Sequence, residues 1–320
     1  MRSTAMVLVL CAAARVAGAQ APATRPRIFH LDSYHQGYGL SDETDTGIKA
    51  ALHGKPVELS TFYLDTKRHS KEEEIRQSVA KARAAIERFR PNVLIASDDP
   101  AVRYVVLPYY KDGPTPVVFC GVNWSAEPYG LPNANVTGMI EVVPVLETID
   151  LARKSFPRIR KLGVLSEDSL SEQSNKTQLE PKYHALGLEV TYVMVKDYAS
   201  WKQEFEKLQD QVDILYLPTQ GAVQNWNEPD ARAFVRQRTK KPAVTTDAFM
   251  MPYALFGLTK TAVEQGEWAA AAALSILAGK KPADIPVVRN RRRKAYLNPT
   301  LAAQLKFVPG PELEGAKTVE

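Results

Sequence analysis

Residues 116–139 read PVVFCGVNWSAEPYGLPNANVTGM, a short apolar run followed by a long polar loop. The apolar run from Val117 to Cys120 is typical of a strand that is buried on both faces of a parallel sheet. Gly121 is expected to end this strand. Asn123 and Trp124 follow where open α/β sheets bind their ligands, at the carboxyl ends of the strands. The pattern predicts the ligand-facing edge of one lobe, and an ordinary strand–helix unit with a long loop is the alternative.

The same alternation of short apolar strands and amphipathic helices extends along the chain on both sides of this stretch. It predicts two halves of like architecture, each a parallel sheet with helices on both faces. Strands are expected at 27–32, 57–64, 92–96, 161–165, 189–195, 213–217, 243–246 and 253–258, with short edge segments at 287–288 and 295–297. Helices are expected over 41–52, 72–89, 98–109, 142–157, 172–186, 201–208, 231–238, 261–278 and 299–305.

Composition bounds the class of protein. The chain has 320 residues, of which 45% are hydrophobic and 24% charged, so it is long enough for two globular domains. The net charge of +5 is modest, and the basic cluster at 291–294 has no nucleic-acid motif beside it, so no nucleic-acid partner is expected. The absence of a phosphate-binding glycine loop and of G-x-S-x-G from the sequence argues against nucleotide cofactors and hydrolase chemistry.

The N-terminus has the pattern of a secretory signal. Arg2 precedes a short apolar region, and small residues around Ala19 provide a cleavage site, so residues 1–19 are expected to be a signal peptide and the protein periplasmic. The bulky Leu10 before Cys11 disfavours a lipid anchor there. Cleavage leaves Cys120 alone, and a single cysteine in an apolar strand indicates packing rather than chemistry. His30 and His35 lack further ligands at metal spacing, so no metal site is expected.

Five segments, taken in order, carry a family resemblance: PVVF at 116–119, NVTG at 135–138, KKPAVTTDAF at 240–249, QGEWAAAAALSILAGKKPADIPV at 265–287 and YLNPTLAAQL at 296–305. Together they resemble the substrate-binding proteins of ABC transporters of the tryptophan/tyrosine-binding kind, which have the type I periplasmic binding protein fold. The resemblance covers nearly the whole mature chain. It implies two doubly wound α/β lobes joined by a hinge, with residues 26–139 plus 265–320 in lobe one and 140–264 in lobe two. The crossovers would fall near 138–142 and 258–266.

Two loops depart from the amino-acid-binding pattern, namely SYHQGYGLSDE at 33–43 and NWSAEPYG at 123–130. Polar clusters that follow apolar strands in both halves are the candidate ligand-binding residues. Asp98 and Asp99 are also candidates for helix capping. Asp247 is expected to carry the polar recognition and Trp124 the apolar contact. The full candidate set is Ser33, Tyr34, His35, Tyr38, Asp98, Asp99, Asn123, Trp124, Gln220 and Asp247.

These observations predict a monomeric periplasmic solute-binding protein, without enzymatic activity or cofactor. It would capture a small organic ligand, such as an amino acid or aromatic compound, and deliver it to an ABC permease. A ligand-sensing module of the same fold that reports to a membrane receptor is the alternative, and an exported enzyme is a third reading that no catalytic constellation supports.

Overall fold

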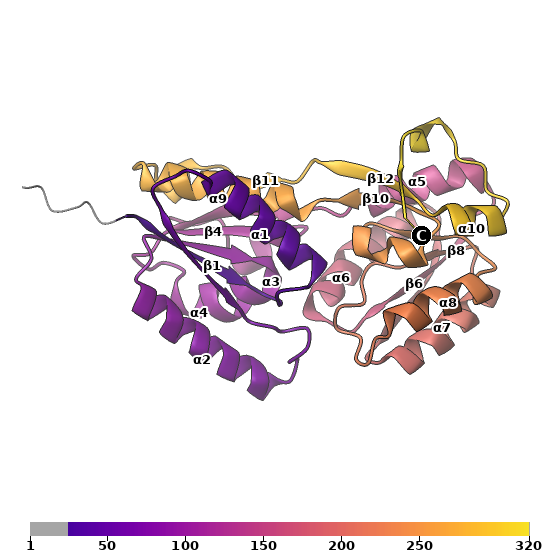
Figure 1. Ribbon diagram of the computed structural model, residues 1–320, viewed down its shortest axis with the longest axis horizontal. Coiled ribbons are helices and arrows are strands. Elements are labelled where there is room, and N and C mark those ends of the chain that lie inside the picture. The colour runs from indigo at the N-terminus through magenta and orange to yellow at the C-terminus, as the bar shows by residue number, and fades with distance from the viewer. Residues whose placement is uncertain (1–24, 320) are drawn as a thin grey trace, which may run out of the picture.

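The computed structural model describes residues 25–319, which form two α/β lobes lying side by side (Figure 1). The α/β class and the two helix-flanked, mostly parallel sheets expected from the sequence are confirmed. The expected signal peptide at 1–19 and Cys11 lie outside the described residues.

The first lobe is built on a six-stranded sheet whose strand order is β11-β5-β4-β3-β1-β2. Every pair in it is parallel. Helices α1 and α9 pack on one face of the sheet, and α2, α3 and α4 pack on the other. The elements are β1 (Arg27–Asp32), α1 (Gly39–Leu52), β2 (Glu58–Tyr63), α2 (Glu72–Phe89), β3 (Val93–Ser97), α3 (Asp98–Ala101), a π-helical turn (Val102–Val106), α4 (Leu107–Tyr109), β4 (Val117–Asn123), β5 (Val136–Glu141), α9 (Ala262–Leu277) and β11 (Val288–Arg289).

The second lobe contains a seven-stranded sheet in the order β13-β12-β10-β9-β8-β6-β7. Strands β6 to β10 are parallel, and β12 pairs antiparallel with β10. The elements are α5 (Val145–Ser155), β6 (Lys161–Glu167), α6 (Leu170–Ala185), β7 (Glu189–Val195), α7 (Tyr198–Gln211), β8 (Ile214–Tyr216), α8 (Glu228–Arg238), β9 (Ala243–Thr245), β10 (Phe256–Lys260), β12 (Arg293–Leu297), α10 (Pro299–Gln304) and β13 (Lys317–Thr318).

Both sheets repeat one strand order, 2-1-3-4-5 in the first lobe and 7-6-8-9-10 in the second. In the first sheet, the connections that follow the neighbouring strands β1 and β3 run in opposite directions. The same is true of β6 and β8 in the second sheet. A crevice forms there beyond the carboxyl ends of the strands, and ligands bind in it. The topology therefore makes the carboxyl ends of both sheets the place to look for a functional site.

Three segments cross between the lobes. Residues 142–144 lead from β5 to α5, Thr261 leads from β10 to α9, and residues 290–292 lead from β11 to β12. These segments lie along one edge of the molecule (Figure 1). Asn290 ties two of them together, because its side chain accepts a hydrogen bond from the Val142 amide (2.7 Å) and donates one to the Val142 carbonyl (3.3 Å).

The C-terminal segment is divided between the lobes, so the expectation that all of 265–320 belongs to lobe one is wrong for its last part. β11 adds to the first sheet, but β12 and β13 belong to the second, and α10 packs into the second lobe's core through Leu301 and Ala302. β12 pairs with the edge of β10 and β13 pairs with β12, and nothing in the sequence periodicity of these short strands specifies that pairing.

Three local expectations are also corrected. Gly121 does not end β4: it adopts φ +77°, a conformation that suits glycine, and forms an irregularity in the pairing with β5 before the strand continues to Asn123. The expected strand at 253–258 begins instead at Phe256, after a 3-10 turn over Ala248–Tyr253. Neither Asp98 nor Asp99 is the N-cap of the helix that they begin, since that position is Ser97.

Candidate functional site

The carboxyl ends of both sheets face each other and enclose a small polar chamber of about 20 Å³. We call it the interlobe chamber. It is lined from the first lobe mainly by side chains that follow β1, β2, β3, β4 and β5, and from the second by those of α6 and of the ends of β8, β9 and β10. Its lining residues are Tyr34, Tyr38, Leu40, Lys67, Asp98, Asn123, Glu141, Val143, Ser171, Glu172, Asn175, Tyr216, Pro218, Thr219, Asp247 and Lys260.

Direct hydrogen bonds join the two lobes around this chamber. The Tyr34 hydroxyl lies 2.6 Å from the Ser171 hydroxyl, and the Tyr38 hydroxyl lies 3.0 Å from that of Thr219. Ser171 also donates to the Asp98 carboxylate (3.2 Å). Because all these contacts require the lobes to be close together, the structure shows the closed arrangement of the molecule.

An ion pair between Lys67 and Glu167 also crosses from one lobe to the other. Both side chains are buried, with 3% and 0% exposed, respectively. The Lys67 ammonium lies 4.5 Å from the ring centre of Tyr34 and 5.1 Å from that of Tyr38, so it also makes cation–π contacts. Glu167 accepts a second hydrogen bond from the Ala222 amide (2.6 Å). The pair is thus desolvated and well coordinated in the closed form.

A second buried ion cluster lies where the chamber meets the crossovers. Lys260, at the end of β10, pairs with Glu141 at the end of β5 and lies 3.5 Å from the Asp247 carboxylate. Burial alone would lower the pKa of Lys260, but the adjacent Asp247 and Glu141 raise it above its ordinary value. Lys260 therefore stays protonated, and its charge is already matched by carboxylates.

Two other carboxylates on the chamber wall are held by neutral groups. Asp98, which adopts φ +74°, accepts from the Asp99 amide (2.9 Å) and from Ser171. Glu172 accepts from Ser166 (2.7 Å) and Asn175 (2.8 Å), and burial raises its pKa. These contacts orient the two carboxyl groups without supplying a cation, and because burial favours the protonated form of Glu172, a cationic ligand group beside it would favour its carboxylate form.

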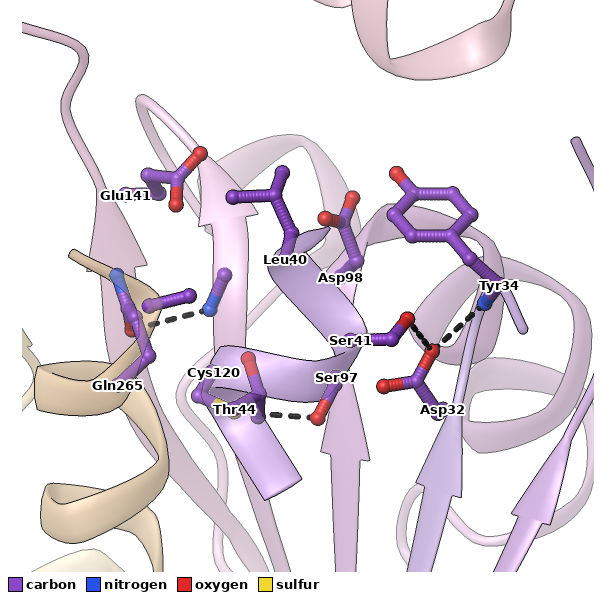
Figure 2. Close-up of a pocket in the computed structure, with 12 residues that line it drawn as sticks. Asp32, Tyr34, Leu40, Ser41, Thr44, Ser97, Asp98, Cys120, Glu141 and Gln265 are labelled. Carbon is purple, nitrogen blue, oxygen red and sulfur yellow. Dashed lines mark hydrogen bonds between the residues drawn. The ribbon is translucent and has the colours of Figure 1, made fainter. Parts of the chain in front are cut away.

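A rear compartment, also of about 20 Å³, adjoins the chamber inside the first lobe, between α1 and α9. It shares Tyr34, Leu40, Asp98 and Glu141 with the chamber, and these side chains lie together at the ends of the strands (Figure 2). The complete lining is Asp32, Tyr34, Leu40, Ser41, Thr44, Ser97, Asp98, Cys120, Gly121, Glu141, Ala262 and Gln265.

Gln265 on α9 is held in this compartment by one end only. Its side-chain oxygen accepts a hydrogen bond from the Gly121 amide (3.1 Å), as the dashed line in Figure 2 shows. Its side-chain nitrogen has no hydrogen-bond partner although the residue is only 2% exposed. A buried donor without a partner costs free energy, so an acceptor placed beside the Gln265 nitrogen would stabilise the protein.

Five of the ten residues that the sequence singled out line the chamber: Tyr34, Tyr38, Asp98, Asn123 and Asp247. They all follow buried strands, as the sequence argument required. Asp247 was expected to carry the polar recognition of the ligand, but its carboxylate contacts Lys260 of the protein itself.

The remaining candidates lie elsewhere. The Ser33 hydroxyl donates to the Ser97 carbonyl (2.5 Å), and Asp99 accepts from Asn123 (2.6 Å) and Tyr129 (2.7 Å), so both serve the interior of the first lobe. His35 and Gln220 line a separate groove on the outer side of Tyr38.

Trp124 is a contact between the lobes rather than part of the chamber wall. It adopts φ +64°, and its indole nitrogen donates to Asn175 of α6 (2.8 Å). The Trp124 ring also packs against the second lobe's core. Its aromatic surface is thus used in closing the lobes.

Five residues that line the chamber or the rear compartment were not predicted from the sequence: Lys67, Glu141, Glu172, Lys260 and Gln265. Glu141 and Lys260 directly follow apolar strands, which was a usable signal, but they lie where the crossovers were expected. Lys67 belongs to a highly charged loop that reads as solvated, and Gln265 lies in an alanine-rich helix. Their importance depends on how the lobes pack.

His30 and His35, the two histidines weighed for a metal site, contact side chains of the first lobe. His30 lies between Asp45 (2.9 Å) and the Ser97 hydroxyl (2.7 Å), and His35 lies 3.4 Å from Asp65. Within residues 25–319, no group of three or more His, Cys, Asp or Glu side chains is arranged to hold a metal ion. No helix in the same range has the length and apolarity needed to cross a membrane.

Comparisons with known proteins agree with this architecture. Residues 38–312 match the family model described as ABC transporter substrate binding protein. No curated protein sequence matches the chain.

Solved structures of similar fold cover almost the whole chain. A domain from Streptococcus pneumoniae in complex with L-Trp has 18% identity and a TM-score of 0.74, over 93% of this chain and 100% of that one. A conserved domain protein from Vibrio cholerae has 18% identity and a TM-score of 0.73, over 92% and 99%. A substrate-binding protein with adhesive properties from Clostridium difficile, in its ligand-free, open form, has 17% identity and a TM-score of 0.66, over 92% and 99%. The shared fold is that of type I periplasmic binding proteins.

Proposed function

Because the chain belongs to the family of ABC transporter substrate-binding proteins, we propose that it captures a small organic ligand between its two lobes and delivers it to an ABC permease. Members of this family bind small ligands and work with ABC permeases rather than catalysing reactions. The observation that supports the proposal is the interlobe chamber, whose wall is supplied by both lobes at the carboxyl ends of both sheets. A ligand held by both walls stabilises the closed form over the open one.

The chamber wall supports an amine as part of the ligand. Asp98 and Glu172 present carboxylates that hydroxyl, amide and backbone groups orient but do not neutralise. Tyr34 and Tyr38 add aromatic surface beside them. An amino acid, an aromatic amine or a related compound fits this chemistry, and the similar domain from Streptococcus pneumoniae was crystallised with L-Trp.

The place of action that we propose is the periplasm, on the basis of the signal-like sequence at 1–19. We propose that the protein acts there as a monomer, with one chamber formed by the two lobes of one chain. If the protein delivers its ligand to a permease, cells that lack its gene should lose uptake of the ligand. A plasmid copy of the gene should restore that uptake. Retained uptake combined with a lost transcriptional or kinase response would identify the sensing role instead.

A thermal-shift screen over amino acids, aromatic acids and amines tests ligand capture, because a ligand that binds only the folded state raises the melting temperature. Small-angle scattering should then show a smaller radius of gyration at saturating ligand, as the lobes close. The variant Asp98→Asn should bind the ligand more weakly, and Asp112→Asn, at an exposed turn of the same lobe, should bind it normally. A ligand that binds without compaction, or that Asp98→Asn binds as tightly as the wild type does, would refute capture in the chamber.

A further inference from the structure

Acidic side chains outnumber basic ones among the residues that line the interlobe chamber. Among the described residues that line it, four carry carboxylates (Asp98, Glu141, Glu172 and Asp247) and two carry ammonium groups (Lys67 and Lys260). Both ammonium groups are already used: Lys67 pairs with Glu167, and Lys260 contacts Glu141 and Asp247. A ligand carboxylate would therefore have to compete with buried protein carboxylates for either lysine. A ligand ammonium would find Asp98 and Glu172 without such competition.

The rear compartment requires a hydrogen-bond acceptor from the ligand. The side-chain nitrogen of Gln265 is a buried donor with no partner, and its side-chain oxygen is fixed by Gly121. Turning the amide over would bring its NH₂ group against the Gly121 N–H, so the nitrogen must find its acceptor within the compartment. Its volume of about 20 Å³ is close to the space that one water-sized group needs.

The acceptor that fits beside Gln265 is uncharged. The compartment is lined by the carboxyl groups of Asp32, Asp98 and Glu141, and no Lys, Arg or His is among its described lining residues. An anionic oxygen would be repelled by those carboxylates at short range, whereas a hydroxyl or carbonyl oxygen would accept from Gln265 without that penalty. A hydroxyl would in addition donate to one of the carboxylates.

We propose that the ligand of the interlobe chamber is a short organic cation that carries a neutral oxygen and no carboxylate, the class of small amino alcohols and amino amides. Its ammonium binds Asp98, with Glu172 on the opposite lobe, and its oxygen accepts from Gln265. Asp98, Tyr34, Leu40 and Glu141 line both cavities, so the cavities adjoin, and the ligand that we propose is short enough to place its ammonium in one and its oxygen in the other. The inference rests on the proposed function and specifies the ligand class for the same site.

Matched probe series test this ligand class by isothermal titration calorimetry. Because the two cavities are small, the first series is ethanolamine (cation with hydroxyl), ethylamine (cation alone), glycine (zwitterion) and acetate (anion), and the second is the equivalent alanine-derived set. We expect the amino alcohol of at least one series to bind about tenfold more tightly than the corresponding amine, the factor that one hydrogen bond supplies. It should exceed the amino acid by at least the same factor, and the anion should bind most weakly.

Variants of Gln265 assign the oxygen contact. Gln265→Met keeps the volume and removes the donor, and Gln265→Glu keeps the acceptor for Gly121 but replaces the donor nitrogen by oxygen. In both variants the affinity ratio of amino alcohol to amine should fall to about one, whatever happens to the absolute affinities. Ser275→Ala, on the exposed face of α9, is the matched control and should retain the wild-type ratio.

The outcomes separate this inference from the proposed function. Tighter binding of the amino acid or of the anion overturns the ligand class, and so does an amino alcohol preference that survives in Gln265→Met. If no member of either series binds, the ligand class is also overturned. The proposed function is refuted by separate results: the ligand found by the wider screen fails to compact the protein, or Asp98→Asn binds that ligand as tightly as the wild type does.

Discussion

Replacing Lys67 with methionine should weaken ligand binding much more than it weakens folding. The Lys67–Glu167 ion pair joins the two lobes, so it exists only when they are closed. In the open form, water reaches both groups, and the methionine costs no more than an ordinary exposed substitution, within about 0.5 kcal/mol. In the closed form, the substitution leaves Glu167 buried without its cation.

The cost of closure follows from the surroundings of Glu167. Removing one partner of a buried ion pair costs about 3–5 kcal/mol, most of it from the charge left behind. Glu167 keeps its hydrogen bond from the Ala222 amide, so the low end of this range applies, even though methionine also removes the cation–π contacts of the ammonium with Tyr34 and Tyr38. A penalty of about 3 kcal/mol on closure corresponds to an affinity about 100-fold weaker.

Calorimetric titration with the ligand from the thermal-shift screen measures this effect, and urea unfolding of the unliganded protein measures folding stability. Lys81→Met, on the exposed face of α2, is the control and should change neither quantity. The double variant Lys67→Met/Glu167→Gln should regain part of the lost affinity, because no charge is then left unpaired. Unchanged affinity in Lys67→Met, or a loss of folding stability as large as the loss of affinity, would refute the assignment of this pair to closure.

Three further predictions concern closure and pH. Gly221→Ala should weaken ligand binding by about 1–3 kcal/mol through overpacking of the closed form, because the new Cβ would lie 2.4 Å from the Tyr38 ring and 2.9 Å from the Lys67 stem. Titration of Gly221→Ala measures this loss, and Gly310→Ala, where the new Cβ meets only the flexible end of Glu312, is the control. Trp124→Phe should cost about 1 kcal/mol of affinity by removing the hydrogen bond to Asn175, and normal ligand affinity in this variant would contradict that role. Burial raises the pKa of Asp32 to about 6, so the folded state holds this proton more tightly than the unfolded chain and loses stability as the pH rises from about 4 to 6. Asp32→Asn should therefore gain about 2–3 kcal/mol over the wild type in urea unfolding at pH 7 and lose that advantage near pH 3.5, and equal differences at both pH values would argue against it.

The sequence predicted the parallel strands and long helices well, because each has a strong periodic pattern and a clear stop. The helix expected at 72–89 and the strand expected at 189–195 have the same bounds in the structure. The expected return of the whole tail to lobe one failed at β12 and β13. Strands of five and two residues carry too little pattern to specify a partner, so the edge of β10 receives β12 and the outer edge of β12 receives β13.

Only part of the candidate site could be predicted from the sequence. The rule that ligand contacts follow buried strands placed Asp98, Asn123 and Asp247 on the chamber wall. It could not identify Lys67, whose contact with Glu167 joins segments 100 residues apart in different lobes. Nor could it show that Trp124 serves closure, because its partner Asn175 lies in the middle of a helix of the other lobe. Contacts between lobes depend on their relative orientation, which no local pattern encodes.

The ion cluster of Lys260 links the chamber to the hinge. Glu141 ends β5 just before the first crossover, and Lys260 ends β10 just before the second, so their ion pair holds two crossovers together. Asn290 holds the third crossover to Val142, the residue after Glu141. Glu141, Lys260 and Asp247 also line the chamber, so a ligand cation placed there changes the electrostatic balance of the groups that fix the hinge. If the proposed capture of a cation in the chamber is right, we expect ligand charge and lobe closure to be coupled through Glu141, and a neutral ligand of the same shape to close the lobes less strongly.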